Sequence, residues 1–255
     1  MTMNFTEIQQ SLRRLRLSGM SETLEARALQ ADQGRLPFME AFATMLQDEL
    51  DRRDTKAIDG RFRKSGLDER RLLSEIDWGF NPKLPRNAIL ELFTLKFLAQ
   101  GENALLIGNA GTGKSHIAKA LALAALKSGY GIVYSDAQDL VIGTGELTGI
   151  KRKKMLKTFS ETDLFVIDDL FLRKLPPNSV EELQEVVFAR YRKQKSTIIT
   201  SNRVIEDWSK LLGDAAATSA ILDRLMHRCK MLDFEGPSWR LKESAESIAK
   251  KGRNR

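Results

Sequence analysis

The fold of this chain is decided by the stretch Gly108-Asn109-Ala110-Gly111-Thr112-Gly113-Lys114-Ser115. It satisfies the pattern G-x-x-x-x-G-K-[ST], in which glycines let backbone N–H groups surround a phosphate without interference from Cβ atoms. The apolar run 104–107 leads into it and the Ala/Leu-rich segment 113–128 leads out, so a strand precedes the loop and a helix follows. We therefore predict a nucleotide-binding P-loop, with Lys114 on the β/γ-phosphates and Ser115 on Mg²⁺. His116, the next residue, is grouped with this stretch, as a packing or surface residue rather than a catalyst.

A second motif, Leu164-Phe165-Val166-Ile167-Asp168-Asp169, is an apolar run that ends in two carboxylates. Asp168 is placed to hold Mg²⁺ through its water shell. Asp169, one residue later, is placed to orient or deprotonate the attacking water. The alternative for both is an ordinary turn at the end of a strand.

A third apolar run, Thr197–Thr200, is followed by Ser201 and Asn202. A polar side chain at the tip of a strand beside the two motif strands would contact the γ-phosphate or the attacking water. Asn is also a common turn residue, so spacing alone leaves both roles open for Asn202.

Short apolar runs alternate with helical segments throughout residues 100–235. The expected strands are 104–107, 132–134, 164–167, 197–200 and 231–234, and the clearest helices are 113–128 and 180–193. Strand and helix alternating in this way predict an α/β fold with a parallel sheet covered on both faces.

The first 75 or so residues have helical periodicity. One face carries Phe5, Ile8, Leu12 and Leu15, Ser21 suits a second N-cap, and Pro37 suits the first turn of a third helix with Phe38, Phe42, Met45 and Leu46 on one face. We expect these apolar side chains to form the core of a small helical domain. The linker 78–85, rich in Pro and Gly, ends it, so the predicted domains are 1–78 (helical), 79–245 (nucleotide-binding) and 246–255 (a frayed basic tail).

Composition narrows the class of protein. The 255 residues include 41 Lys and Arg against 34 Asp and Glu, a net charge of +7, which suits a polyanionic partner without requiring one. Cys229 is the only cysteine and His116 and His227 the only histidines, which excludes a disulfide framework and leaves little for a metal centre. The apolar stretch 117–126 contains Lys119 and is too short to span a bilayer, and no secretory signal is present, so we expect a cytoplasmic protein with no membrane partner.

The densest positive run is Lys151-Arg152-Lys153-Lys154, with Lys157 close behind. Such cations would neutralise DNA phosphates without reading sequence. No aromatic residue interleaves with the run before Phe159, which gives little support to stacking on single-stranded bases. A solvated helix face is the alternative.

Together the motifs resemble those of an AAA+ ATPase. The segments 108–115, 164–169, 200–202, 221–225 and 236–241 are similar to Walker A, Walker B, sensor 1, the arginine-finger box and sensor 2. The branch resembles the DnaC/IstB group of helicase loaders and ATPase helpers of insertion-sequence transposases. Residues 73–82 and 17–20 are similar to IstB proteins rather than to loaders.

The resemblance implies a five-stranded AAA+ core with a truncated lid, since only 53 residues follow Asn202. It implies ATP and Mg²⁺ as cofactors, and an N-terminal helical domain that contacts DNA or transposase. It also implies a homo-oligomer on duplex DNA with ATP at its subunit junctions, which recruits the cognate transposase until hydrolysis resets the assembly. The catalytic set would be Lys114, Asp168, Asp169, Asn202 and Arg224, with Arg224 reaching the ATP of a neighbouring subunit and Arg240 as the sensor 2 arginine, in cis or in trans.

One residue departs from the AAA+ pattern. Many members have Glu where this chain has Asp169, and the shorter side chain predicts slow hydrolysis. The resemblance implies that DNA stimulates this hydrolysis. Three alternatives stay open from sequence alone: a DnaC-like helicase loader, a nucleotide kinase acting on a small acceptor, and a module that binds ATP only as a structural ligand.

Overall fold

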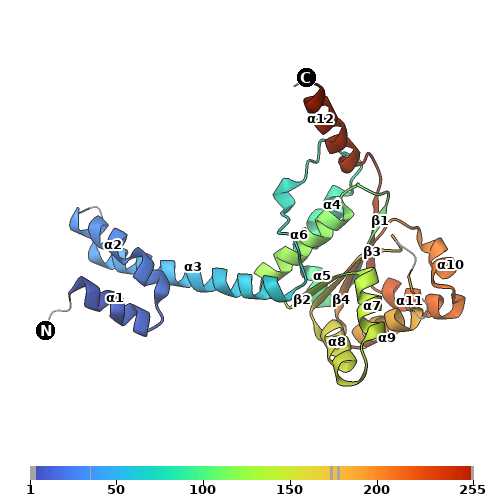
Figure 1. Cartoon of the computed structure of the whole chain (residues 1–255), viewed down its shortest axis with the longest axis horizontal. Helices are drawn as coiled ribbons and strands as arrows, with labels where there is room; N and C mark the ends of the chain where they lie inside the picture. Colours follow the sequence, from blue (N-terminus) through green and yellow to red (C-terminus); the bar gives the residue numbers. More distant parts are fainter. Residues whose placement is uncertain (1–3, 35, 173–174, 177–178, 254–255) are drawn as a thin grey trace. The chain divides into compact units, whose positions relative to one another are not determined.

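The computed structural model describes residues 4–34, 36–172, 175–176 and 179–253. The chain forms two compact units, Met1–Arg61 and Phe62–Arg255 (Figure 1). Each unit is described by itself below.

Helices α1 (Phe5–Arg14), α2 (Ser18–Asp32) and most of α3 (Phe38–Lys64) make up the N-terminal unit, so the predicted helical content is confirmed. Asn4 begins α1 through a capping box with Glu7. The prediction that Ser21 caps the second helix is wrong, because α2 begins at Ser18 and Ser21 is buried within it. The first turn of α2 is instead capped from α3, since Gly19 N donates to Glu49 Oε2 at 2.6 Å.

The predicted core of this unit is also wrong. Phe5, Leu15 and Phe38 are 43%, 66% and 75% exposed, and Ile8 and Phe42 also lie on the surface. The buried apolar side chains among the described residues of the unit are Met20 and Leu24 on α2 and Ala41 on α3. Periodicity identified the helices, but three helices in so short a segment enclose too little volume to bury every apolar face.

The second unit is built on a five-stranded parallel sheet, as predicted. Its strands are β1 (Asn103–Gly108), β2 (Ile132–Asp136), β3 (Leu164–Leu170), β4 (Ser196–Ser201) and β5 (Cys229–Phe234), in the order β2-β3-β4-β1-β5. The strand expected beside the two motif strands is therefore confirmed, because β4 lies between β3 and β1. All five carboxyl ends meet at one edge.

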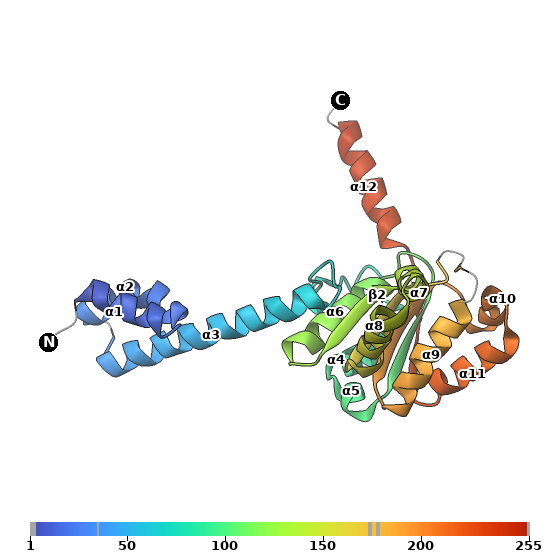
Figure 2. The same cartoon turned by 60° about the horizontal axis from the view of Figure 1, so that its bottom comes forward.

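Helices cover both faces of the sheet (Figures 1 and 2). One face carries α6 (Lys114–Lys127), which with α4 (Arg86–Phe93) and α5 (Lys96–Gln100) buries Ile117, Leu121, Ile89 and Phe97. The other face packs Leu105, Phe165 and Ile199 against a second set of helices. That set is α7 (Ala137–Glu146), α8 (Gly149–Glu161), α9 (Ser179–Arg192), α10 (Trp208–Leu212) and α11 (Ala215–Met226).

The connecting segments tie the strands and helices of this unit together. Two 3-10 turns, η1 (Leu73–Glu75) and η2 (Ile205–Asp207), precede α4 and α10 respectively. The boundary between the two units lies after Arg61, whereas the sequence places the end of the helical domain at residue 78. The segment between these positions contacts the second unit. Tyr134 N donates to Ser65 O at 2.7 Å, and Lys119 pairs with Asp68 at 2.8 Å. The linker 78–85 consists of turns, and its buried Asn81 donates to Glu235 O at 2.7 Å.

One helix, α12 (Trp239–Arg253), follows β5 in the described part of the chain. The prediction of a frayed tail is therefore wrong up to Arg253, while residues 254 and 255 lie outside the described residues. The segment 242–251 consists mostly of Ala, Glu, Lys and Ser, which tolerate or favour helix. No helix in the described ranges has the length and apolarity that crossing a bilayer requires.

Candidate functional site

The P-loop connects the carboxyl end of β1 to the start of α6. Gly108, Gly111 and Gly113 have φ values of 145°, 79° and 102°, in the region that side chains disfavour. A Cβ on Gly108 would collide with the backbone of Phe234, and one on Gly111 with Ser238. The conformation that lets backbone N–H groups face an anion therefore depends on these glycines, and the first turn of α6 lies next to it.

Lys114 is folded back onto its own loop. Its Nζ donates to the carbonyls of Gly108 and Asn109, both at 2.7 Å, and the residue is only 5% exposed. Burial lowers the pKa of Lys114, and the nearby carboxylates of Asp169 and Asp168 partly oppose that shift. The ammonium is thus held beside the loop, next to the carboxylates that end β3.

Asp168 is buried and both of its carboxylate oxygens are hydrogen-bonded. Tyr134 on β2 donates to Oδ2, and Thr200 on β4 donates to Oδ1. The same Thr200 hydroxyl accepts from Asp169 N at 2.9 Å. Two neutral donors from the flanking strands therefore fix the orientation of this carboxylate.

Asp169 differs from its neighbour in backbone and in surroundings. Its φ is 54°, a left-handed conformation that is uncommon outside glycine, and it turns the side chain into the cavity beside the P-loop. Burial raises the pKa of Asp169, and the carboxylates of Asp168 and Asp136 raise it further. A carboxylate with a raised pKa is suited to accepting a proton.

Asn202 follows the end of β4 and lines the same cavity. Its Oδ1 is buried and has no hydrogen-bond donor among the described residues. A buried acceptor without a donor is costly, so this atom favours a ligand or water that donates to it.

The cavity has a volume of about 540 Å³ and opens beside the P-loop. We call it the P-loop cavity. Its lining includes residues 110–117, Asp169 and Asn202, together with Phe80, Trp239 and Arg240. Trp239 N donates to Gly111 O at 2.9 Å, which anchors the start of α12 to the loop. A cavity that combines a phosphate-binding loop with two aromatic side chains suits a nucleotide.

Arg240 and His116 both line the P-loop cavity of their own chain. Arg240 is exposed and near enough to oppose the rise in the pKa of Asp169. The His116 ring lies 3.1 Å from Leu72 O and 3.8 Å from Glu75, which fits its expected packing role.

Arg224 lies elsewhere. It belongs to α11, its guanidinium lies over the Phe188 ring at 3.8 Å, and its Nη1 donates to Ala220 O at 2.9 Å. It lines a second cavity that shares no lining residue with the P-loop cavity. The structure therefore does not bring Arg224 to the nucleotide site of its own chain.

The basic run lies on α8. Lys151, Lys153 and Lys154 are exposed, whereas Arg152 pairs with Glu182 at 3.0 Å and Glu185 at 2.7 Å on α9. Within this run Arg152 therefore joins two helices, and the three lysines carry the free charge.

The sequence did not single out Tyr134, which holds Asp168, or Phe80 as a wall of the cavity. For Tyr134 a signal existed: it lies on an expected strand two residues before Asp136, which aligns with Asp168 in the sheet. Knowing which strands are neighbours was the missing step.

The family model of the IstB-like ATP binding protein matches residues 10–247. The chain belongs to the IstB-like ATP-binding protein family. An insertion-sequence ATP-binding protein of Geobacillus stearothermophilus is 31% identical over 92% of this chain and 94% of its own length. One from Mycobacterium tuberculosis is 30% identical over 91% of this chain and 93% of its own length. The chain is thus an ATP-binding member of an insertion-sequence family.

Solved structures share the fold of this IstB-like chain. DnaI matches with a TM-score of 0.55 at 18% identity, over 66% of this chain and 90% of that one. DnaA from Aquifex aeolicus, solved with AMPPCP, matches with a TM-score of 0.54 at 23% identity, over 72% and 56%. The DnaC helicase loader matches with a TM-score of 0.50 at 22% identity, over 69% and 99%. The second unit therefore has the AAA+ P-loop fold.

Proposed function

We propose that this chain is an ATP-hydrolysing helper of DNA transposition, which assembles on duplex DNA with ATP and recruits the cognate transposase. The observation that carries the proposal is the convergence of Lys114, Asp169 and Asn202 on one cavity in a chain that matches insertion-sequence ATP-binding proteins along more than nine-tenths of its length. That match favours a transposition partner over a helicase, because the likeness to helicase loaders is one of fold.

The P-loop cavity supports ATP as the substrate and Mg²⁺ as its cofactor. Lys114 would leave the carbonyls of Gly108 and Asn109 to contact the phosphates. Ser115 and Asp168 would hold Mg²⁺, Asp168 through water because Tyr134 and Thr200 already occupy its oxygens. When bound, Mg²⁺ neutralises charge that develops on the transferred phosphoryl group.

Asp169 and Asn202 would handle the attacking water. Asn202 Oδ1 is a buried acceptor without a donor, and a water O–H would supply one. The raised pKa of Asp169 suits it to accept a proton, and its side chain lines the cavity. We infer that Asn202 orients the water and that Asp169 takes its proton.

The two arginines would act from different copies. Arg240 lines the P-loop cavity of its own chain, which supports action in cis. Arg224 lines a separate cavity, which supports action in trans, on ATP bound by a neighbouring copy. ATP at such a junction would join the copies, and hydrolysis would loosen them.

The Lys114→Ala variant tests the proposal. We expect it to lose ATP binding, because the cavity then lacks its phosphate cation, and to lose ATP-stimulated DNA binding at the same time. Fluorescent nucleotide titration and duplex-DNA binding with and without ATP measure both. The control is Lys127→Ala, at the other end of the same helix. Retention of both activities by Lys114→Ala would sink the assignment.

A further inference from the structure

Tyr134, on the edge strand β2, reaches across the sheet to Asp168 on β3. In the parallel register Tyr134 aligns with Val166, and Asp136 aligns with Asp168. Side chains on a strand alternate between the two faces of a sheet, so residues 134, 166 and 168 share one face. Along this face the Tyr134 hydroxyl donates to Asp168 Oδ2, while Thr200 donates to Oδ1 from the other neighbouring strand, β4. Asp168 is thus held by side chains of both strands that flank β3.

The position of Tyr134 is itself fixed by its neighbours. Its backbone N–H donates to the carbonyl of the buried Ser65 at 2.7 Å. Gly66 follows with a φ of 81°, and a Cβ there would come within 2.3 Å of Tyr134 O. Lys119 Nζ, which pairs with Asp68 at 2.8 Å, lies 5.6 Å from the centroid of the Tyr134 ring. The segment after α3 and a side chain of α6 therefore hold Tyr134 against Asp168.

The contact between Tyr134 and Asp168 is a hydrogen bond from a neutral phenol to a carboxylate. Burial raises the pKa of Tyr134, and the charge of Asp168 raises it further, so the phenol keeps its proton and remains a donor. The donors to Asp168 are both neutral, so its negative charge stays available to a cation. Tyr134 does not line the P-loop cavity. It would therefore act through Asp168 and not by touching the nucleotide.

We propose that Tyr134 is a positioning residue of the ATPase site, which orients the Asp168 carboxylate and thereby sets the affinity of the site for the divalent cation that accompanies ATP. This inference rests on the proposed function, which supplies ATP and Mg²⁺. Hydrogen-bond partners that orient a metal-binding side chain contribute about 10–100-fold in metal affinity or activity. Without the phenol, Thr200 alone would hold the carboxylate, which could then turn about that single contact.

The Tyr134→Phe variant tests the inference, because it removes one hydroxyl and keeps the ring. In EDTA a non-hydrolysable ATP analogue should bind the variant as it binds the wild type, since the P-loop is intact. With Mn²⁺ present, the variant should bind the analogue about 10–100-fold more weakly than the wild type does. The Mg²⁺ concentration that gives half-maximal hydrolysis should rise as well. The control is Tyr130→Phe, which removes a hydroxyl from a residue before β2 begins and should change none of these values.

The Asp168→Asn background separates positioning from general support of the fold. There, Tyr134→Phe should weaken Mn²⁺-dependent binding no further, because the carboxylate that Tyr134 orients is already gone. A further loss that adds to that of Asp168→Asn would show that Tyr134 acts by another route, and would overturn the inference.

Two other outcomes would overturn it. One is a Tyr134→Phe variant that binds the analogue with Mn²⁺ as tightly as the wild type, which would leave the hydroxyl with a packing role alone. The other is a loss of analogue affinity in EDTA, which would make Tyr134 act on the nucleotide itself. Failure of the proposed function is distinct, because the wild-type chain would then show no metal-dependent nucleotide binding and no hydrolysis.

Discussion

Asp168 and Asp169 are adjacent carboxylates in different surroundings. Tyr134 and Thr200 each donate to one oxygen of Asp168. Asp169 donates from its backbone N–H to Thr200, and its pKa is raised by burial and by neighbouring carboxylates. Neighbouring carboxyl groups in such different environments take different roles. Asp168 is suited to holding a cation, and Asp169 to taking a proton.

The Asp169→Asn variant separates binding from chemistry. We expect its ATP affinity to stay within about threefold of the wild type, because Lys114 and the P-loop are untouched. Turnover should fall by about 10²–10⁴-fold, the usual contribution of a general base. Nucleotide titration and steady-state phosphate release measure the two. The Asp169→Glu variant, which keeps a carboxylate, should retain turnover, and an Asn variant that turns over normally would refute the role.

Among individual site residues, the sequence predicted the charged ones but not the side chains that hydrogen-bond to them. Lys114 and Asp168 were found because each lies in a short motif that local chemistry explains. Tyr134 was missed because its contact with Asp168 spans two strands, and neither sequence distance nor composition says which strands are neighbours. Asn202 was placed correctly beside the P-loop, but only burial showed that its Oδ1 lacks a donor.

The N-terminal helices meet at one close approach. A Cβ on Gly19 would come within 2.7 Å of Asp48 O and of Glu49 Cα, so α2 approaches α3 more closely there than a larger residue allows. The Glu49 carboxylate accepts from Gly19 N at 2.6 Å and pairs with Arg53 at 2.6 Å. The resemblance to IstB proteins around residues 17–20 thus includes a residue with a packing role.

The hydrogen bonds of Glu49 predict that the stability of the contact between α2 and α3 depends on pH. Burial would raise the pKa of Glu49, but the hydrogen bonds from Arg53 and Gly19 outweigh it and the net pKa is lowered. A lowered folded-state pKa gives stability that is present above the unfolded value, about 4.3, and that disappears as pH falls through the folded value. We expect hydrogen exchange in α2 to accelerate over that range, after correction for the intrinsic rate, and Glu49→Gln to remove the acceleration. An identical pH response in both proteins would exclude Glu49 as its source.

Helix α8 carries two kinds of cationic side chain. Arg152 forms ion pairs with α9, whereas Lys151, Lys153 and Lys154 are exposed to solvent. Replacing Lys151, Lys153 and Lys154 by alanine should weaken DNA binding and reduce the slope of log K against log salt by about 0.9 for each phosphate that is no longer neutralised. Arg152→Ala, which removes one cation already paired with Glu182 and Glu185, should leave the slope unchanged. Affinity titrations over a range of salt concentrations measure both. An unaltered slope in the triple variant would exclude a role of these α8 lysines in DNA binding.

Apolar periodicity predicted which helices and strands the chain forms, but it did not predict which of their side chains are buried. Each expected strand lies within an observed one, and α6 and α9 match the expected helices to within one residue at each end. The apolar face of α3 was taken as core, yet Phe38 and Phe42 stack on each other at the surface. A stripe of apolar residues specifies a helix face but not the surface that covers it.

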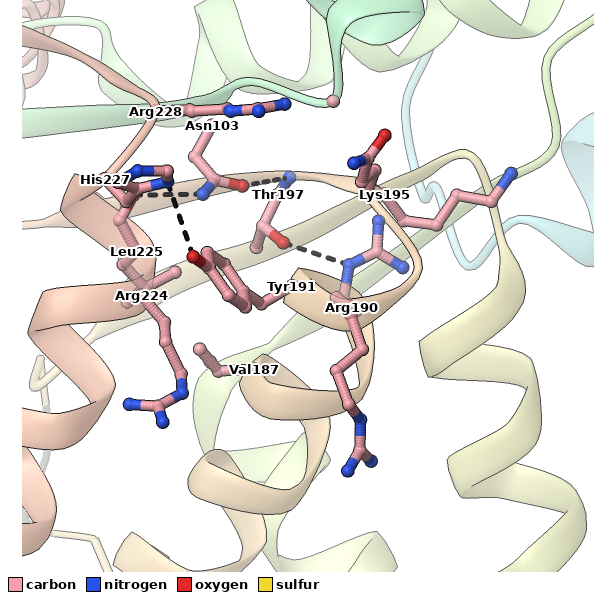
Figure 3. A pocket seen from close by; sticks show the side chains of 13 residues that line it. Asn103, Val187, Arg190, Tyr191, Lys195, Thr197, Arg224, Leu225, His227 and Arg228 are labelled. Atoms are coloured by element: carbon pink, nitrogen blue, oxygen red, sulfur yellow. Dashed lines mark hydrogen bonds between the residues drawn. The ribbon is translucent and has the colours of Figure 1, made fainter.

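The second unit has its two cavities on opposite edges of one sheet. The P-loop cavity lies where the strands end, and the second cavity, which Arg224 lines, lies where they begin (Figure 3). A single copy cannot bring these edges together without breaking the sheet, whereas copies arranged head to tail can. Heterologous contacts of this kind generate rings or filaments.

Such an arrangement predicts that hydrolysis depends on protein concentration. The specific activity of the wild type should rise with concentration until assembly is complete, because in that arrangement each ATP would need an arginine from a second copy. Arg224→Ala should bind ATP normally, stay small in sedimentation with a non-hydrolysable analogue, and hydrolyse on the order of 10³-fold more slowly. Ser219→Ala, which alters an exposed residue of the same helix, is the matched control. A specific activity that is constant from monomer to oligomer would show that each copy completes its own site.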